Sequence, residues 1–265
     1  MVNKSRVDEK AQLQKYRLKP NLGKSFHVIE LLDDRFLQEF LKKLSDVMGA
    51  PNEKAAASMF IKRYAFVAVL SLYSMTVWNK RLDVSLPNIK MEMPEPGKDW
   101  LPSFSLVNET LQSWNGQDRT KWRKEMVNSL FAENIEILIQ KLAKTTGISK
   151  LILWENIAVY LFWLYETELK NSKLTNGVED FTYLLFEAEG PLFGAYNLNP
   201  LHRYYKINVV EWDNEVRIRN TCCFSYQLRA GKRCKTCPCT QNAIDGRCQS
   251  GEGIYCTIRS VDRKI

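Results

Sequence analysis

Seven cysteines lie close together in the C-terminal part of this 265-residue chain, and no cysteine precedes them. Cys222 and Cys223 are adjacent, Cys234 follows after ten residues, and Cys237 follows after two more. Disulfide frameworks belong mainly to small secreted domains, whereas a chain of this length can bury a core without them. The four spaced thiols therefore indicate a metal site or an iron–sulfur site.

The adjacent pair helps to distinguish these two kinds of centre. Structural zinc sites usually take cysteines that are roughly two to four residues apart, so that both sulfurs turn onto one ion. Adjacent side chains diverge, so Cys222 and Cys223 would strain the backbone around a single small ion. A two-iron cluster offers ligand positions that are farther apart, and the pattern therefore favours [2Fe–2S]. A zinc site remains the alternative.

The motif from Cys222 to Cys237 resembles the C-terminal signature of the FhuF-type ferric-siderophore reductases. The neighbouring Arg219, Thr221 and Tyr226 also resemble that family. The resemblance implies that the four cysteines of the motif hold a [2Fe–2S] cluster, which passes electrons to siderophore-bound Fe(III). It also implies a long mixed domain ahead of the cluster segment.

Three further cysteines, Cys239, Cys248 and Cys256, depart from that signature. Cys239 stands two residues after Cys237 and could replace it as a ligand. The predicted ligand set is therefore the four cysteines of the motif, with Cys239 as a substitute for Cys237.

The segment around the cysteines is strongly basic. The formal net charge of the chain is +8, and no acidic residue occurs between Arg217 and Ile244. A thiolate-bound cluster is anionic, so nearby cations favour its reduced form and attract anionic ferric chelates. A solvated basic face is the plain alternative, and a nucleic-acid interface is the least favoured. The predicted substrate contacts in this segment are Arg229, Lys232, Arg233 and Lys235.

One loop ahead of the cysteines adds a weaker candidate. Residues 199–205 include His202, Arg203 and Tyr204. A loop of this kind could face the cluster and offer Arg203 to a substrate, although loops also collect such residues for capping and solvation. Arg203 completes the predicted substrate contacts.

Helical periodicity dominates the part of the chain that must position these residues. Residues 1–205 are predicted to form a mainly helical α+β domain. Its predicted helices cover about 33–47, 53–78, 117–144, 149–169 and 178–188, and its predicted strands cover 82–86, 89–93 and 104–106. The strands alternate apolar and polar residues, as half-buried antiparallel strands do.

Residues 206–265 are predicted to form a β-hairpin followed by the cysteine-rich cluster segment. The hairpin pairs strands 207–209 and 216–218 across a turn near Asp213 and Asn214, and its second strand leads directly to Thr221 and Cys222. The fold class is therefore α+β: a mainly helical domain with small antiparallel elements, and a C-terminal hairpin that leads into the iron–sulfur segment.

Several classes of protein are disfavoured. The chain has no glycine-rich phosphate loop, no GxGxxG turn and no GxSxG elbow, so it is not expected to bind NAD(P)H by a dinucleotide fold. Its electrons would come from an external donor protein of the ferredoxin, flavodoxin or reductase type. The sequence shows no secretory signal and no apolar run of about 20 residues, so we expect no transmembrane segment. A cytoplasmic location follows, with peripheral contact at the inner face of the membrane left open.

The predicted function is one-electron reduction of ferric siderophore iron. Hydroxamate, catecholate and carboxylate oxygens are hard ligands that hold Fe(III) more strongly than Fe(II), so reduction releases the iron. Two alternatives come from other classes: a zinc-stabilised binding module, and an iron–sulfur redox sensor that turns over no substrate.

Overall fold

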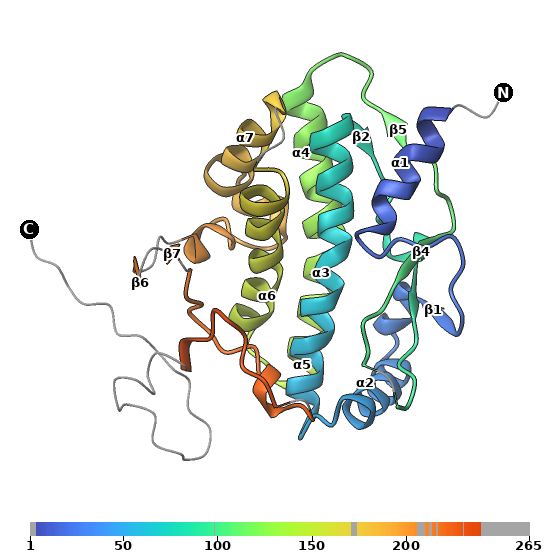
Figure 1. Cartoon of the computed structure of the whole chain (residues 1–265), viewed down its shortest axis with the longest axis vertical. Coiled ribbons are helices and arrows are strands. Elements are labelled where there is room, and N and C mark those ends of the chain that lie inside the picture. Colours follow the sequence, from blue (N-terminus) through green and yellow to red (C-terminus); the bar gives the residue numbers. More distant parts are fainter. Residues whose placement is uncertain are drawn as a thin grey trace, which may run out of the picture.

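A long central helix, α3 (Glu53–Trp78), runs through the computed structural model (Figure 1). The structure describes residues 4–97, 99–170, 174–205, 210–211, 214–215, 217–229 and 231–239. The side chain of Asn52 accepts a hydrogen bond from the backbone N–H of Ala55 at the start of α3, and Asn79 ends the helix in a left-handed conformation. Buried residues occur all round α3, which is typical of a core helix.

The predicted helices are confirmed, and their start signals are those that the sequence shows. Asp33 caps α2 and Ser149 caps α6 through their side chains, while Gly147 ends α5 in a left-handed conformation. A further helix, α1, precedes the first predicted one. The bounds are α1 Lys4–Gln14, α2 Asp34–Met48, α4 Arg119–Leu130, α5 Glu136–Thr146, α6 Lys150–Trp163 and α7 Thr175–Thr182.

Three of these helices, α4, α6 and α7, are each followed directly by one π-helical turn. The turns are Phe131–Ile135 between α4 and α5, Leu164–Glu168 after α6, and Tyr183–Glu187 after α7. The predicted helix over 117–144 is therefore two α-helices joined by a π-turn. Such a turn adds one residue to the helical repeat and rotates the faces on either side of it.

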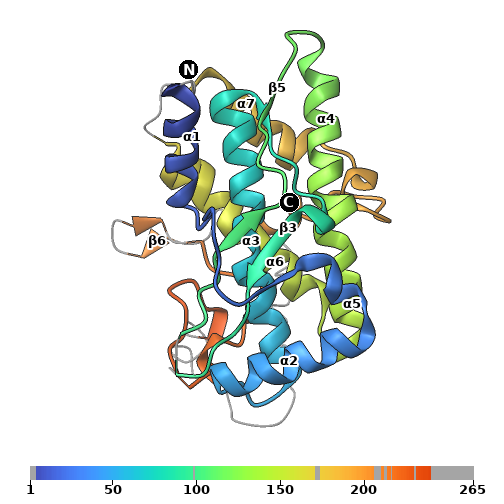
Figure 2. The same cartoon turned by 90° about the vertical axis from the view of Figure 1, so that its right-hand side faces the viewer.

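Two small antiparallel sheets cover one side of α3, with α6 and α7 on the other side (Figures 1 and 2). In the first sheet Met91 pairs with both Phe26 and Phe104. The second sheet pairs Lys80 with Ser113. The strands are β1 Ser25–His27, β2 Lys80–Arg81, β3 Ile89–Glu92, β4 Phe104–Leu106 and β5 Gln112–Ser113. The order in the first sheet is β1-β3-β4.

The strand predicted over 82–86 is wrong. Leu82 and Val84 are buried, so the alternation itself is real. This stretch has no ladder partner among the described residues; instead the side chain of Asn134 donates a hydrogen bond to the Val84 carbonyl, and a 3₁₀ turn begins at Leu86. Period-two burial here comes from an extended segment that packs on the core.

The C-terminal hairpin is described in part. Its described strands are β6 (Val210–Glu211) and β7 (Asn214–Glu215), which pair antiparallel. The predicted first strand, 207–209, lies outside the described residues. In the predicted second strand, residue 216 lies outside the described residues, and Arg217 and Ile218 belong to no strand. The α+β class, mainly helical with small antiparallel elements, is confirmed.

By length and composition, α3 is the one helix within the described ranges that could cross a membrane. However, 89% of its apolar window is buried inside the protein. That environment is the one that a core helix of a folded domain occupies.

Candidate metal centre

The sulfur atoms of the described cysteines form two groups. The Sγ atoms of Cys222, Cys237 and Cys239 all lie within 4.8 Å of one another. The Sγ atoms of Cys223 and Cys234 are 3.9 Å apart. The adjacent cysteines therefore contribute to different groups, as their diverging side chains dictate. The four predicted ligands and the substitute Cys239 all lie in this segment, whereas Cys248 and Cys256 lie outside the described residues.

The backbone of this segment directs one N–H group toward sulfur and closes a turn between two cysteines. Phe224 has a left-handed conformation, with φ of 62°, and its N–H donates to Cys222 Sγ at 3.4 Å. A turn joins the last two cysteines of the motif, because the Cys237 N–H donates to the Cys234 carbonyl at 3.0 Å. Hydrogen bonds to thiolate sulfur are one of the means by which a protein sets the potential of a cluster.

Helix α3 holds the cysteine segment from one side. The hydroxyl of Ser58 donates to the carbonyl of Cys223 at 2.9 Å. One turn later on the same helix face, Lys62 Nζ lies 3.5 Å from Cys223 Sγ. Cys223 itself is only 1% exposed. The central helix therefore fixes both the backbone and the sulfur of this cysteine.

Helix α6 holds the same segment from the other side. Both carboxylate oxygens of Glu155 accept backbone N–H groups, from Asn220 at 2.6 Å and from Thr221 at 2.7 Å. The hydroxyl of Thr221 donates to the same carboxylate. The side chain of Asn156 donates to the carbonyl and the hydroxyl of Ser58, both at 2.9 Å, and so joins α6 to α3.

Arg219 is buried beneath the cysteines. It is 3% exposed, and its Nη2 donates to Asn156 Oδ1 at 2.7 Å. Its Nε lies 3.6 Å from Glu155 Oε2, and neither Nε nor Nη1 has a hydrogen-bond acceptor among the described residues. A buried guanidinium with unused donors fits a site that receives further anionic atoms. The donor set of thiols around it is the one that iron–sulfur clusters use.

The charges around Cys223 favour its thiolate form, whereas burial raises the pKa of Cys222. The pKa of Cys223 is lowered because Cys234 hydrogen-bonds with its sulfur and because Lys62 and Arg219 are near. A hydrogen bond from Arg233 Nη1 to Cys237 Sγ, at 3.8 Å, raises the pKa of that guanidinium. Thiolates are the ligands of metals, so the cations near Cys223 favour the form of this cysteine that binds a metal.

The predicted cationic contacts are exposed around this centre. Arg229, Lys232, Arg233 and Lys235 all present their side chains to solvent. The other two arginines of the basic segment have structural partners, since Arg219 is buried and Arg217 makes a bidentate ion pair with Glu166 at 2.7 and 2.8 Å. The basic surface is therefore narrower than the sequence alone indicates.

Arg203 borders a cavity of about 740 Å³ between the start of α6 and the loops that follow α7. Trp154, Phe186 and Leu198 also line this cavity. The carbonyl of Arg203 accepts a hydrogen bond from the side chain of Asn220 at 3.4 Å. The cavity therefore adjoins the residues that lead to the first cysteine.

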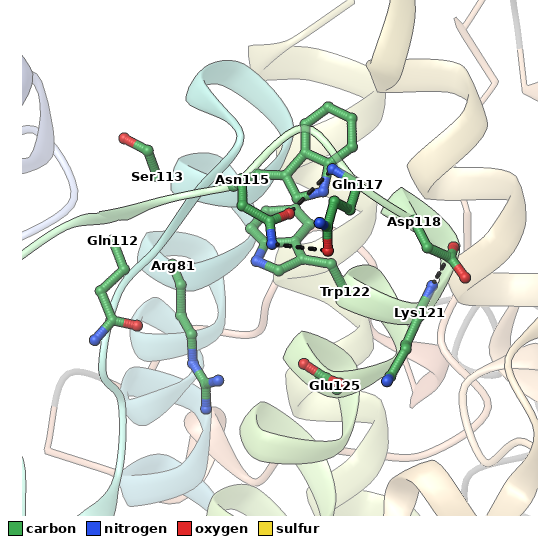
Figure 3. A pocket seen from close by; sticks show the side chains of 10 residues that line it. Arg81, Gln112, Ser113, Asn115, Gln117, Asp118, Lys121, Trp122 and Glu125 are labelled. Atoms are coloured by element: carbon green, nitrogen blue, oxygen red, sulfur yellow. Dashed lines mark hydrogen bonds between the residues drawn. The ribbon is translucent and has the colours of Figure 1, made fainter.

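A second, more polar cavity of about 340 Å³ lies beside α4 and β5 (Figure 3). Arg81, Lys121 and Glu125 line it, and Asn115 donates to Gln117 at its edge at 3.3 Å. None of the predicted site residues lines this cavity.

Sequence reasoning missed the residues that receive the cysteine segment: Ser58, Lys62, Glu155 and Asn156. Glu155 and Asn156 are buried polar residues inside α6, whose other buried residues are apolar. Buried carboxylates and amides are rare without partners. This interruption of an apolar helix is the signal that could have identified them.

Two family models match the chain. Residues 58–208 match the family described as "Ferric iron reductase FhuF-like transporter". Residues 219–238 match the family described as "FhuF 2Fe-2S C-terminal domain". The first match covers more than half of the chain and includes Lys62 and Glu155, and the second includes the four cysteines of the motif. A comparison with curated proteins finds no match for the chain.

Proposed function

Because the chain belongs to the family of FhuF-like ferric iron reductases, we propose that it reduces siderophore-bound Fe(III) to Fe(II) in the cytoplasm. The chain carries a [2Fe–2S] cofactor in its C-terminal segment. In this proposal residues 1–205 form the body that receives the cluster segment, and residues 206–265 form that segment. The released Fe(II) leaves the siderophore because hard oxygen ligands hold it weakly.

The proposed ligands of the cluster are Cys222, Cys223, Cys234 and Cys237. The C-terminal family match supports this set because it ends at residue 238, before Cys239. The proximity of Cys239 to Cys222 and Cys237 keeps it as the substitute. When bound, the cluster supplies single electrons to the ferric ion.

The observation that carries the proposal is the cationic setting of a buried cysteine. Lys62 lies 3.5 Å from Cys223 Sγ, and the unused N–H groups of Arg219 lie in the same buried region. A reduced cluster carries one more negative charge than an oxidised one, so fixed cations favour the reduced state. Such an arrangement suits a centre that accepts an electron from a donor and then passes it on.

The other residues of the site would handle the substrate and the donor. We propose that the exposed Arg229, Lys232, Arg233 and Lys235 attract ferric siderophores, and that Arg203 contacts the substrate from its cavity. The electron donor is an external protein of the ferredoxin, flavodoxin or reductase type. The helices α3 and α6 hold the cysteine backbone in place, which limits reorganisation between the two redox states.

Anaerobically purified protein tests this function directly. We expect about two irons and two inorganic sulfides per chain. When the chemically reduced protein is mixed with a ferric trihydroxamate, a ferrous-specific chelator should capture Fe(II) as the cluster absorption returns to its oxidised form. Stoichiometric zinc without visible absorption would contradict the cluster, and a reduced cluster that persists in the presence of every ferric chelate would contradict the reductase.

A further inference from the structure

Two arginines lie near the partly exposed side of α3 that carries Lys62. Arg63 follows Lys62 on that helix, and Arg17 comes from the turn after α1. Phe66, one helical turn after Lys62, lies below the guanidinium of Arg17, with Cζ 4.4 Å from its ring centre. Neither arginine belongs to the basic segment around the cysteines.

Arg17 has an unusual backbone for its residue type. Its φ is 70°, in the left-handed region that glycine and asparagine adopt at lower cost. The chain is held there because the Arg17 carbonyl accepts a hydrogen bond from the N–H of Phe104 at 2.8 Å. An arginine at such a position points to a use for its side chain, because glycine would serve the backbone better.

The side chain of Arg17 lacks a complete set of partners. Its Nη1 is buried, and no acceptor lies within hydrogen-bond distance among the described residues. Burial lowers the pKa of this guanidinium. A buried donor on a charged group is costly when it has no acceptor, so an anion or an ordered water is expected at this atom.

Arg63 is in a similar position. Its Nη1 donates to the thioether sulfur of Met48 at 2.9 Å, and a thioether is a weak acceptor. Its Cζ lies 5.6 Å from the ring centre of Trp100. Burial lowers the pKa of Arg63 to about 10, and the charge of Arg17 acts in the same direction. The two guanidiniums are therefore close enough to repel each other.

No carboxylate of the described residues lies within ion-pair distance of Arg17 or Arg63; Asp99 acts on Arg63 from farther away. Two like charges with few acceptors, partly buried over the rings of Phe66 and Trp100, need an anion to offset their desolvation. The planar guanidinium fork matches a carboxylate. An anion held there would adjoin Lys62, which contacts Cys223.

We propose that Arg17 and Arg63 bind a carboxylate arm of the ferric substrate and place its iron beside Cys223. This inference rests on the proposed function and names its substrate class: a ferric chelate that carries free or coordinating carboxylates, such as a citrate-based dihydroxamate. The exposed cations around the cysteines attract such a chelate from solution, whereas Arg17 and Arg63 select it by contact.

The test uses gallium in place of iron, because Ga(III) chelates keep the shape and charge of the ferric ones and accept no electron. Calorimetry on the oxidised holoprotein would compare the Ga(III) complex of a citrate-based dihydroxamate with that of a neutral trihydroxamate. Arg17→Gly and Arg63→Lys should each weaken binding of the carboxylate complex by about tenfold or more and leave the neutral complex unaffected. Arg35→Gln removes one exposed charge of α2 and should leave both unchanged.

A thermal melt separates this role from a purely structural one. Arg17→Gly should melt at the same temperature as the wild type or higher, because glycine relieves the left-handed backbone and a partly unpaired charge is removed. Equal binding of the carboxylate complex by wild type and both variants would overturn the inference. So would equal losses for both complexes, or no binding to wild type at millimolar concentration. Protein that binds the gallium complex but reduces no ferric chelate would contradict the proposed function alone.

Discussion

The ammonium group of Lys62 lies 3.5 Å from the Sγ of Cys223, although 161 positions of the chain separate the two residues. Lys62 projects from the central helix α3, and Cys223 comes from the cysteine segment that is bound against it. The buried residues of α3 are mostly apolar, and a partly buried lysine among them is unusual. The contact with Cys223 explains why Lys62 stands there.

Replacing Lys62 should change the reduction potential of the cluster. Lys62→Met removes a fixed positive charge next to a proposed ligand, and the potential should fall by on the order of 50 mV, close to the shift that a tenfold change in a one-electron equilibrium produces. Lys62→Arg should retain most of the wild-type value. A redox titration followed by EPR measures both, with Lys235→Met as an exposed control. An equal shift in that control would contradict a specific role for Lys62.

Substitution of the cysteines should identify the ligands. Serine at Cys222, Cys223, Cys234 or Cys237 should abolish or strongly alter the visible absorption and EPR spectrum, because an oxygen ligand replaces a thiolate. Serine at Cys248 or Cys256 should leave both spectra nearly unchanged. Cys239→Ser decides between the two possible sets. Loss of the cluster in Cys239→Ser but not in Cys237→Ser would change the assignment by one ligand.

Glu155 should be needed to retain the cluster. Its carboxylate accepts hydrogen bonds from the N–H groups of Asn220 and Thr221 and lies beside the guanidinium of Arg219. Glu155→Ala would therefore leave two backbone donors without an acceptor and a buried cation without its nearest carboxylate. We expect iron release to a chelator to accelerate about tenfold or more, at unchanged helix content. Glu166→Ala is the matched control, because its ion pair with Arg217 is more exposed. Equal release rates in the two variants would contradict the anchoring role.

The exposed cations should make reduction of charged chelates depend on salt. At roughly 0.15 M salt the screening length is about 8 Å, so attraction between exposed charges is already weakened. Arg229→Gln with Lys232→Gln should slow the reduction of an anionic ferric chelate and flatten its salt dependence. A neutral trihydroxamate should respond much less. Stopped-flow mixing with the chemically reduced protein isolates this step from docking of the donor, and equal salt dependence for both chelates would contradict it.

The buried carboxylate of Asp180 should be the main electrostatic support of the helical body away from the cluster. It is fully buried and accepts two hydrogen bonds from Arg119, at 2.7 and 2.8 Å, and one from Arg123 at 3.2 Å. Asp180→Ala should lower the free energy of unfolding by about 3–5 kcal/mol, because it leaves buried cations unpaired. Glu179→Ala, which removes an exposed carboxylate of the same cluster, should cost less than about 1 kcal/mol in chemical denaturation.

Much of the fold follows from local signals in the sequence. The caps at Asp33, Asn52 and Ser149 and the left-handed Gly147 mark helix ends where the structure has them. The π-turns do not follow from such signals, because one added residue barely changes the apolar period of a long helix. The segment at 82–86 shows the same limit, since alternate burial does not reveal whether a partner strand exists.

The cysteine motif indicated the cofactor, but not the site that surrounds it. Spacing along the chain identifies residues that can reach one another locally, and the thiols satisfy that condition. Lys62 and Glu155 approach the cysteines only through the packing of α3 and α6, which no local pattern encodes. Arg17 was equally hidden, because its backbone conformation depends on a hydrogen bond from Phe104 in a distant strand.

The cysteine segment is held by two helices that precede it in the chain, and this order has a consequence for biogenesis. Ser58, Lys62, Glu155 and Asn156 are all synthesised before the first cysteine, so their helices can fold while the ribosome is still extending the chain. The cysteine segment then meets a surface that already offers its hydrogen bonds. The order of synthesis therefore allows the body to fold before the cysteines are available to receive iron and sulfide.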